Sequence, residues 1–529
     1  MQKKIALRLS PAESIDPEAV KSYIAASSGV ATSDITGYYP LKRSIDARSR
    51  KAWVNLTVMA TLNEPFISRS IISSSFKDVH KSSRVVVIVG AGPAGLFAAL
   101  ELLEQGIRPV IIERGKDVRE RRRDLARLNK EGIINPESNY CFGEGGAGTY
   151  SDGKLYTRSN KRGDIDKILS LLVRFGADEK ILYESHPHIG TNKLPDIITA
   201  IREQIIQCGG EIYFNEKLTD LDLQAGKIRA IITGSGKRIE GDAYILATGH
   251  SARDIFELLH RKQILIHSKP FALGVRVEHP QALIDQIQYK CLVRDPLLPP
   301  ASYSLVEQVE GKGVFSFCMC PGGIIAPAST SEGTLVVNGW SPSKRNNPFA
   351  NSGMVVEVTM KDLISKGTTS FLPQLGTDEN DPLLLMKFQN LVEEKAFSAG
   401  GGMFVAPAQR LEDFSRNKSS TTLPQCSYVP GLNASHLAEV LPPFIHSRLR
   451  GGFIAFGKSM RGYLSNEAVV VATESRTSSP VRIPRNDDFT HPQISNLYPC
   501  GEGAGYAGGI VSAAMDGQKI SVSISCLYK

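Results

Sequence analysis

The sequence predicts an α/β plus α+β protein, in which a parallel α/β domain is interrupted by a mainly antiparallel domain and preceded by a small α+β module. Three observations in the 529-residue chain lead to this prediction. A strand, a glycine-rich turn, a helix and a second strand follow one another within residues 84–113. From residue 270 several strand-like stretches follow one another without helices between them, as in an antiparallel sheet. Residues 1–63 have the pattern of strand, helix, strand and strand.

Changes in composition set the expected domain boundaries. The stretch after the N-terminal module is rich in serine and basic residues, as a linker would be. Near the C-terminus a second strand–glycine–helix unit completes the interrupted domain. We therefore divide the chain into an accessory module at 1–63, a linker at 64–83, the first part of the parallel domain at 84–265, an inserted domain at 266–460, and return strands with the second part of the parallel domain at 461–529.

The N-terminal module is expected to place one helix against three strands. Asp16 suits the N-cap, Pro17 the first helical position and Gly29 the residue past the helix end. This order of elements suggests half of a ferredoxin-like fold or a small accessory module, whose function the sequence does not reveal. The strands are expected at residues 4–9, 38–44 and 52–60.

The strongest signal is the glycine turn after the first strand of the parallel domain. Residues 85–89 form a β-branched apolar run, as in a parallel strand buried on both faces. Gly90, Gly92 and Gly95 follow at the G-x-G-x-x-G spacing, with a helix expected at 96–105. Such glycines allow a tight turn, close approach of the backbone to a pyrophosphate, and close helix–strand packing. Glu113 ends the second strand, 18 residues after Gly95, where a carboxylate can bind a ribose diol.

Two further glycine-rich or small-residue segments are expected near the same ligand. Residues 142–154 contain five glycines in thirteen positions, which suits a loop that lies close to a flat ligand or a phosphate. A plain flexible loop is the alternative. Ala247, Thr248 and Gly249 end an apolar strand with small residues, where a backbone can pass close to a cofactor.

The inserted domain is expected to combine an antiparallel sheet with two helices. Helices are predicted near 353–366 and 382–398. The strands are expected at 271–278, 303–309, 313–318 and 334–338.

Composition narrows the class of protein further. Hydrophobic residues make up 42% and charged residues 22% of the chain, and no apolar run approaches the roughly 18 residues needed to span a bilayer. The eight cysteines are scattered and no C-x-x-C occurs, so we predict no zinc or iron–sulfur site and no bound metal. Reduced thiols and the lack of a secretory signal predict a cytoplasmic location.

The positive charge is concentrated at the N-terminus. The formal net charge is +8, and residues 1–83 hold 12 Lys and Arg against 7 Asp and Glu. A basic surface of this kind can bind RNA or an acidic partner. A solvated face is the interpretation we favour, so we predict no nucleic-acid partner, and we interpret the arginines of residues 114–130 in the same way.

Three nucleotide-type signatures in this order resemble those of FAD-dependent oxidoreductases whose dinucleotide fold is split around an inserted substrate domain. Within that class the chain is similar, over nearly its whole length, to a family of uncharacterised FAD-dependent dehydrogenases. The shared segments are GEGGAGTYSDGKL at 143–155, HIGT at 188–191, FCMCPGG at 317–323, ESRTSSP at 474–480 and GEGAGYAGGI at 501–510. The resemblance implies a Rossmann-like FAD-binding domain and bound FAD, and leaves the substrate open.

The resemblance also implies which residues hold FAD. Glu113 would bind the adenosine ribose, Thr149 and Lys154 would lie beside the flavin, and Glu502, in place of the usual Asp, would bind the ribitol. The start of the last helix would offer N–H groups to the flavin, where they can stabilise its reduced, anionic form. The predicted cofactor-binding residues are Gly90, Gly92, Pro93, Ala94, Gly95, Glu113, Arg114, Gly148, Thr149, Lys154, Leu218, Ala247, Thr248, Gly249, Gly501, Glu502, Gly508, Gly509 and Ile510.

Two residue types are candidates on the substrate side. Arg476 could anchor an anionic substrate through a bidentate contact, or form a salt bridge with Glu474 or another acid. Cys318 and Cys320 are spaced so that both thiols share one face of a strand. We predict that Cys320, at the end of its strand beside Pro321, lines the substrate cavity; a buried structural cysteine is the alternative.

The predicted function is that of an FAD-dependent oxidoreductase that transfers a hydride or an electron pair between flavin and a small-molecule substrate. NAD(P)H, if it is the electron donor, is expected to bind only transiently, because the chain has only one complete strand–glycine–helix–acid unit. Two other functions remain open: a flavoprotein that docks to RNA through its N-terminal module, and a non-catalytic FAD-bound scaffold or sensor.

Overall fold

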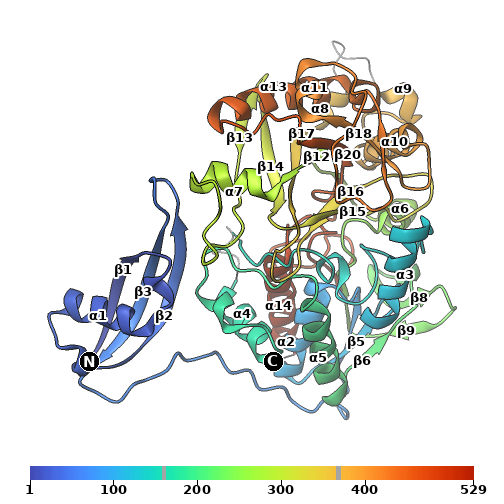
Figure 1. Cartoon of the computed structure of the whole chain (residues 1–529). Coiled ribbons are helices and arrows are strands. Elements are labelled where there is room, and N and C mark those ends of the chain that lie inside the picture. Colours follow the sequence, from blue (N-terminus) through green and yellow to red (C-terminus); the bar gives the residue numbers. More distant parts are fainter. Residues whose placement is uncertain (158–162, 365–370, 529) are drawn as a thin grey trace.

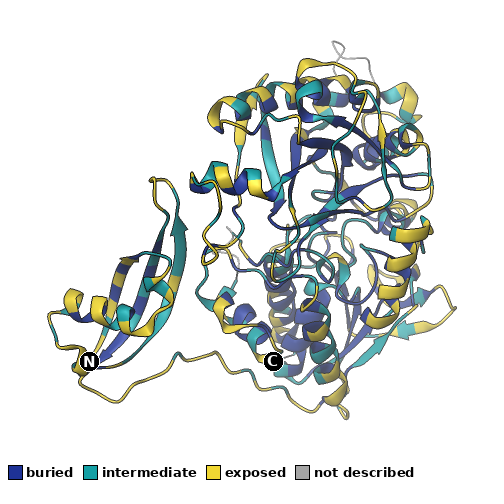
Figure 2. Cartoon of the chain, viewed as in Figure 1, coloured by how far each residue is buried: buried dark blue, intermediate teal, exposed yellow. Residues whose placement is uncertain are grey.

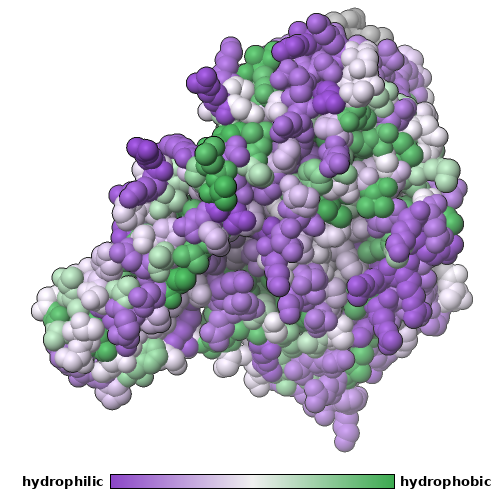
Figure 3. All heavy atoms as spheres, viewed as in Figure 1, coloured by the Kyte–Doolittle hydropathy of each residue, from purple (hydrophilic) through white to green (hydrophobic). Residues whose placement is uncertain are grey.

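A computed structural model describes residues 1–157, 163–364 and 371–528 of the chain. In Figure 1 the domain built on a seven-stranded sheet lies above the parallel-sheet domain, and the N-terminal sheet stands to the left of them. On the face seen in Figure 3, hydrophobic side chains form small groups separated by polar ones. Among the described helices, none has the length and apolar character needed to cross a membrane.

The N-terminal unit has the expected order of elements. It contains β1 (Gln2–Leu9), α1 (Pro17–Ser28), β2 (Ile35–Asp46) and β3 (Trp53–Leu62), with β3 in the centre of an antiparallel sheet. Asp16 accepts a hydrogen bond from the Glu18 amide and caps α1, and Gly29 ends the helix at φ 71°. Arg43 joins this unit to the main body, because its side chain pairs with Glu184 at 2.9 Å and its backbone bonds to Tyr183 and Ser185.

The segment between β3 and the first strand of the parallel domain contains no described helix or strand. Its second half is nevertheless tied to the parallel domain. The amide of Lys77 donates to the carbonyl of Leu103, and the buried Val79 donates to that of Cys208. In Figure 1 the segment runs along the outside of the molecule before it reaches the parallel domain.

The parallel domain confirms the Rossmann-like prediction. Its five-stranded sheet has the order β22-β10-β4-β5-β6, and all neighbours are parallel. β22 comes from the C-terminal part of the chain, so the two predicted halves meet in one sheet. The strands are β4 (Val85–Val89), β5 (Arg108–Ile112), β6 (Glu211–Tyr213), β10 (Ala243–Leu246) and β22 (Leu497–Pro499).

Two helices from opposite ends of the chain pack closely beside this sheet. α2 (Pro93–Gln105) follows the glycine turn, and α14 (Ile510–Cys526) closes the chain. A Cβ at Gly517 would lie 2.1 Å from the Ala94 carbonyl, so this contact requires glycine. Figure 2 shows both helices largely buried. The surrounding elements are α3 (Val118–Glu131), α4 (Ile165–Arg174), α5 (Leu194–Gln207), α6 (Arg253–Arg261), and the antiparallel strands β7 (Leu218–Gln224), β8 (Lys227–Thr233) and β9 (Arg238–Glu240).

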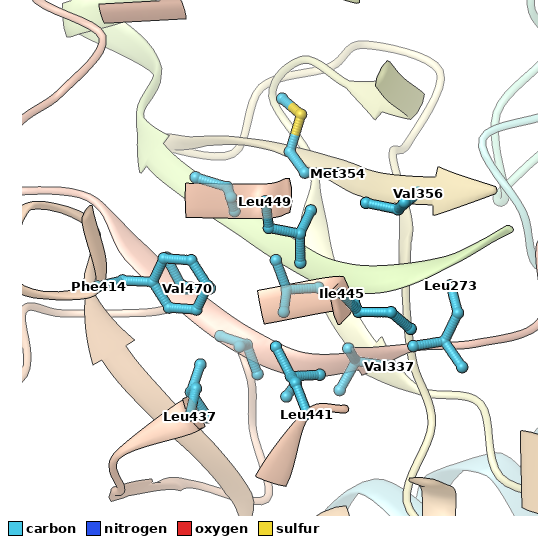
Figure 4. Packing of buried hydrophobic residues seen from close by; sticks show 14 of the residues in the cluster. Leu273, Val337, Met354, Val356, Phe414, Leu437, Leu441, Ile445, Leu449 and Val470 are labelled. Carbon is cyan, nitrogen blue, oxygen red and sulfur yellow. The ribbon is translucent and has the colours of Figure 1, made fainter. Parts of the chain in front are cut away.

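The second domain is built on a mainly antiparallel sheet of order β13-β14-β17-β12-β20-β18-β19. The helices α10 (Leu384–Gly400) and α13 (Pro443–Ser459) pack against it, and Figure 4 shows Ile445 and Leu449 of α13 among strand residues such as Met354. The strands are β12 (Phe271–Pro280), β13 (Val306–Val309), β14 (Lys312–Cys320), β17 (Phe349–Val358), β18 (Ala406–Arg410), β19 (Leu432–Ala434) and β20 (Val469–Glu474). Smaller pairs are β15 (Ile324–Pro327) with β16 (Val337–Trp340), and β11 (His267–Ser268) with β21 (Val481–Arg482).

Several predictions for this domain were wrong. The segment predicted as a helix near 353–366 begins inside β17; only α8 (Met360–Ile364) is helical, and residues 365–366 lie outside the described part of the chain. β17 is a central strand buried on both faces, and its apolar residues from Met354 to Val358 have no period that separates strand from helix. A helix, α7 (Gln281–Tyr289), also lies between β12 and β13, where none was expected.

Two further features of the second domain differ from the sequence-based division. β20 pairs with β12, so the seven-stranded sheet extends past the predicted boundary at residue 460 to Glu474. The long helix α13 was missed because it contains Gly451 and Gly452, which disfavour a helix. Both glycines face the sheet, where a Cβ would lie 2.7 Å from Val309 and 2.6 Å from Val314.

Candidate functional site

The glycine turn between β4 and α2 has a distinct reason for each glycine. Gly90 has φ 109° and would place a Cβ 2.5 Å from the Ala247 carbonyl. A Cβ at Gly95 would lie 2.0 Å from the Gly90 carbonyl, so glycine at this position allows the helix α2 to pack closely against the turn. At Gly92 the nearest atom is the Cα of Gly146, 3.9 Å away, so the space in front of this backbone is open. The turn therefore leaves room for a ligand at the N-terminus of α2.

Glu113 connects this turn to the glycine-rich loop of residues 142–154. Its buried carboxylate accepts hydrogen bonds from the amides of Ala91, Gly115 and Gly143, each at 2.9 Å. The same residue lines the cavity described below. Glu113 thus fixes the relative position of two loops beside the cavity, and its contact with a ribose stays a prediction.

A large cavity lies between the parallel domain and the seven-stranded domain. Its volume is about 1050 Å³, at the upper end of the roughly 300–1,000 Å³ of common ligand pockets. Most predicted cofactor residues lie on its wall: Gly90, Gly92, Pro93, Ala94, Glu113, Arg114, Gly148, Lys154, Leu218, Ala247, Thr248, Gly249, Glu502, Gly508, Gly509 and Ile510. The fold thus brings together segments from the beginning, middle and end of the parallel domain.

Three predicted residues do not line this cavity. Gly95 lies behind the turn, as described above. The hydroxyl of Thr149 is fully buried and donates to the Glu144 carbonyl at 2.7 Å, so it supports the loop from within. The amide of Gly501 donates to Asp516 of α14 at 2.8 Å. The sequence motifs contain these three residues but do not show whether each one faces the cavity or the interior of the protein.

The residues before α14 fit an extended dinucleotide. A Cβ at Gly508 would meet no protein atom within 4 Å, and Gly508 lacks a positive φ, so neither packing nor backbone conformation requires glycine there. Gly249 also faces open space, although its φ of 69° by itself favours glycine. Glycine at Gly508 leaves space that a ligand can fill against the backbone. The open backbone at Gly92 and Gly508, on the wall of one large cavity, therefore fits FAD.

Arg121 holds the glycine-rich loop in place, a role that the sequence did not indicate. We predicted a solvated face for the arginines of this region, but Arg121 is fully buried. Its guanidinium donates to the carbonyls of Asn139 at 2.8 Å, Tyr140 at 3.0 Å and Glu144 at 2.8 Å. The loop therefore has an ordered backbone, contrary to the alternative of a plain flexible loop.

Charged side chains gather at the end of the cavity wall formed by the glycine-rich loop and the second domain. The buried carboxylate of Asp152 lies 3.2 Å from Lys154 and 2.9 Å from Arg345. Burial disfavours ionisation of this carboxyl, but Lys154 and Arg345 outweigh it and hold the pKa of Asp152 well below its usual range. Burial and the neighbouring Arg345 lower the pKa of His188 to about 4, so this imidazole is neutral at neutral pH.

The prediction that Cys320 lines the cavity was wrong. Cys320 is fully buried, and it is Cys318 that lies half-buried on the cavity wall. Pairing of β14 with β17 is interrupted between Phe317 and Cys320, and this irregularity changes the alternation of side chains that we assumed. The two sulfurs still face each other, 4.0 Å apart.

Arg476 forms a structural ion pair. Its guanidinium contacts Glu393 at 3.2 and 3.0 Å and donates to Thr330 at 2.9 Å. Glu474, the partner that we named for it, instead pairs with Arg276 at 2.7 Å. Arg476 also lies on the cavity wall, but its guanidinium already binds the carboxylate of Glu393.

Comparison with known families agrees with this architecture and defines the class. Residues 83–237 match the FAD binding domain, residues 270–477 match the FAD-dependent protein, C-terminal domain-like family, and residues 1–61 match a domain of unknown function. The protein is thus an FAD-binding flavoprotein with an FAD-dependent C-terminal domain.

Comparison with individual proteins shows which family the chain belongs to. An uncharacterised protein of Clostridium beijerinckii is 41% identical over 509 residues, which cover 93% of this chain and 92% of the relative. The chain belongs to the same family of FAD-dependent proteins as this relative. A thiamine thiazole synthase of Pyrobaculum aerophilum is 55% identical over only 49 residues, 9% of this chain and 19% of that protein.

Solved structures resemble the chain only distantly. A geranylgeranyl bacteriochlorophyll reductase-like protein from Thermoplasma acidophilum is 12% identical, covers 84% of this chain over 79% of its own, and gives a TM-score of 0.34.

Proposed function

We propose that the protein is an FAD-dependent oxidoreductase that transfers a hydride or an electron pair between FAD and a small-molecule substrate. The observation that carries this proposal is one continuous cavity. Its wall includes the glycine turn and Lys154, which we expect beside the flavin, and also Cys318 and Arg345, which no dinucleotide motif accounts for. FAD supplies the redox chemistry when bound, and the chain orients the reactants and limits the access of water.

Residues at both ends of the cavity have separable roles in this proposal. Gly92, the N-terminus of α2 and Gly508 would hold the cofactor, since their backbones face open space. Lys154 would place a positive charge beside the reacting groups, where it can stabilise negative charge that develops during reduction.

We further propose that NAD(P)H, if it is the donor, binds transiently. Among the described residues one parallel sheet carries one complete glycine turn with an acidic residue after its second strand. The second glycine segment, before α14, lies on the same cavity and would serve the same cofactor.

An anaerobic reduction screen tests the function. Purified protein with bound FAD is mixed with NADH, NADPH and classes of small metabolites, and the flavin absorbance is followed. The proposal expects bleaching by at least one donor and recovery with an acceptor. Bound FAD that no donor or acceptor turns over would favour a scaffold or sensor, and co-purified RNA with a steeply salt-dependent affinity would favour the RNA-docking function.

A further inference from the structure

Two cysteines form a closely spaced pair beside the cavity. Cys318 and Cys320 have sulfurs 4.0 Å apart, and only Cys318 lies on the cavity wall. Cys318 has φ 47°, in the left-handed region that non-glycine residues seldom adopt. Such backbone irregularities in strands occur next to active sites, where they change the direction of a side chain. Here the irregularity accompanies one thiol on the cavity wall and a second thiol directly behind it.

Both sulfurs are in contact with cationic side chains, of which Lys154 is partly exposed and Arg276 is buried. The ammonium of Lys154 lies 3.5 Å from the sulfur of Cys318 and 3.4 Å from that of Cys320. The fully buried guanidinium of Arg276 lies 3.6 Å from the sulfur of Cys320 and donates to the Cys318 carbonyl at 2.6 Å. Cations this close to a cysteine sulfur favour the thiolate over the neutral thiol.

Within the described part of the chain, the cations around the cysteines outnumber the carboxylates that pair with them by one. Lys154 and Arg345 share the single carboxylate of Asp152, and Arg276 pairs with Glu474. This group therefore contains three cations and two carboxylates. A thiolate at Cys318 would neutralise the remaining charge. The directions of the pKa shifts agree with a thiolate at Cys318. A hydrogen bond from Cys320 and the charge of Lys154 lower the pKa of Cys318 and outweigh its burial. Burial raises the pKa of Cys320.

We propose that Cys318 and Cys320 are a redox-active dithiol that exchanges two electrons with FAD bound in the cavity. The proposal rests on the proposed oxidoreductase function and deepens it, because it makes the second substrate a thiol or disulfide compound. Cys318, on the cavity wall, is the thiol that exchanges with this substrate, and Cys320 is the resolving thiol behind it. A reactive thiolate next to a resolving cysteine is the arrangement that redox cysteines require.

The step balances in atoms and electrons. The Cys318 thiolate and the Cys320 thiol form one S–S bond, and Cys320 loses its proton. The two electrons and this proton would pass to bound FAD, which is the oxidant of this half-reaction. Two thiols of the substrate then reduce the new disulfide by exchange, become a disulfide themselves, and return the protein to its dithiol form.

Electron counting and mass measurement test the dithiol directly. Protein with bound FAD is oxidised in air and titrated with dithionite without oxygen, for the wild type, Cys318→Ser, Cys320→Ser and the control Cys291→Ser. Cys291 is half-buried in the same domain and does not line the cavity. We expect the wild type and the control to take up two more electrons per FAD than the other two variants. In the wild type and the control, the oxidised peptide that contains residues 318–320 should be two hydrogens lighter than the reduced peptide and should not react with iodoacetamide. Equal electron uptake in all four proteins, with both thiols open to alkylation after oxidation and unfolding, would overturn the proposal.

A trapping experiment separates the substrate class from the cofactor. Cystamine, a small disulfide, is added to Cys320→Ser, which cannot resolve a mixed disulfide. We expect one cysteamine unit from cystamine to be bound to Cys318 through a mixed disulfide. If no such adduct forms, the proposed substrate class is wrong. If FAD is bound and bleached by a donor while the thiols stay inert, the dithiol proposal fails and the oxidoreductase function stands. If no donor reduces the FAD, the oxidoreductase function fails and this proposal fails with it.

Discussion

The guanidinium of Arg476 and the carboxylate of Glu393 form a two-point ion pair in the interior, with contacts of 3.2 and 3.0 Å. Arg253 also reaches Glu393, at 2.8 Å, so two arginines share one carboxylate. Burial raises the pKa of Glu393, but the two guanidinium groups outweigh it and lower the pKa to about 2. This pair links α10 to the segment after β20, on the wall of the cavity. It therefore matches the second of the two roles that we considered for Arg476, a salt bridge with an acidic residue, although the acid is Glu393 and not Glu474.

Replacement of Glu393 by Gln should destabilise the protein strongly. The buried Arg476 and the partly buried Arg253 would lose their counter-charge, and removal of one partner from a buried pair costs about 3–5 kcal/mol. Chemical denaturation of both proteins measures the difference. The matched control is Glu412→Gln, which removes a more exposed pair with Arg416 and should cost less than about 1 kcal/mol. Equal stabilities of Glu393→Gln and wild type would show that the pair contributes nothing.

The same carboxylate predicts a pH dependence of stability. The pKa of Glu393 is lower in the folded protein, about 2, than its ordinary value of 4.5, so its stabilisation is present above 4.5 and is lost as the pH falls towards 2. We expect the wild type to lose more unfolding free energy than Glu393→Gln across this window. Parallel curves for the two proteins in this range would contradict the assignment.

Lys154 should control the reactivity of Cys318. The groups that face the two sulfurs are Lys154, Asp152, Arg276, Glu474 and Tyr303. Of these, Lys154 is the cation nearest to the Cys318 sulfur by the contacts above, so Lys154→Met should raise the pKa of Cys318. Its alkylation at neutral pH should then be roughly tenfold slower or more, since one pKa unit corresponds to a tenfold change in the thiolate population.

The pH profile of alkylation by iodoacetamide, read by peptide mass, measures this effect. Lys154→Arg keeps the positive charge and should retain most of the reactivity of the wild type. If Lys154→Met and the wild type gave the same profile, Lys154 would not stabilise the thiolate.

Gly508→Ala should weaken FAD binding without weakening the fold. The added methyl group meets no protein atom within 4 Å and points into space that we assign to the cofactor. A loss of about tenfold or more in affinity, about 1.4 kcal/mol, is expected by fluorescence titration of the apoprotein. Gly234→Ala is the control, because Gly234 also lacks a positive φ, would make only ordinary contacts with an added Cβ, and does not itself line the cavity. Similar FAD affinities for the two variants would remove Gly508 from the cofactor site.

The sequence predicted the parts of the fold that depend on local patterns. The strand, glycine turn and helix from Val85 to Gln105 and the capped helix α1 both follow from neighbouring residues, and the structure contains them. The strand β17 was mistaken for a helix because a run buried on both faces has no polar face to set a period. α13 was missed because Gly451 and Gly452 are selected by close packing on the sheet, which local propensity does not include.

The site could be predicted only in its cofactor half. Gly92, Glu113 and Gly508 lie in recognisable motifs, and the structure gathers them on one cavity. The other half depends on pairs far apart in the sequence, such as Lys154 with Cys318 and Arg276 with Glu474. No spacing rule connects such residues, because only the fold brings the loop, the strands β12 and β14 and the end of β20 together.

The FAD content of the purified protein is the most direct test of the account. We predict about one FAD per chain, held without a covalent bond, so that denaturation releases it into solution and a bulky Gly92→Val substitution in the open turn prevents its retention. Absorbance of the native protein and mass of the released cofactor give the result. A protein that is colourless when pure, and that stays colourless after refolding with FAD, would contradict the account.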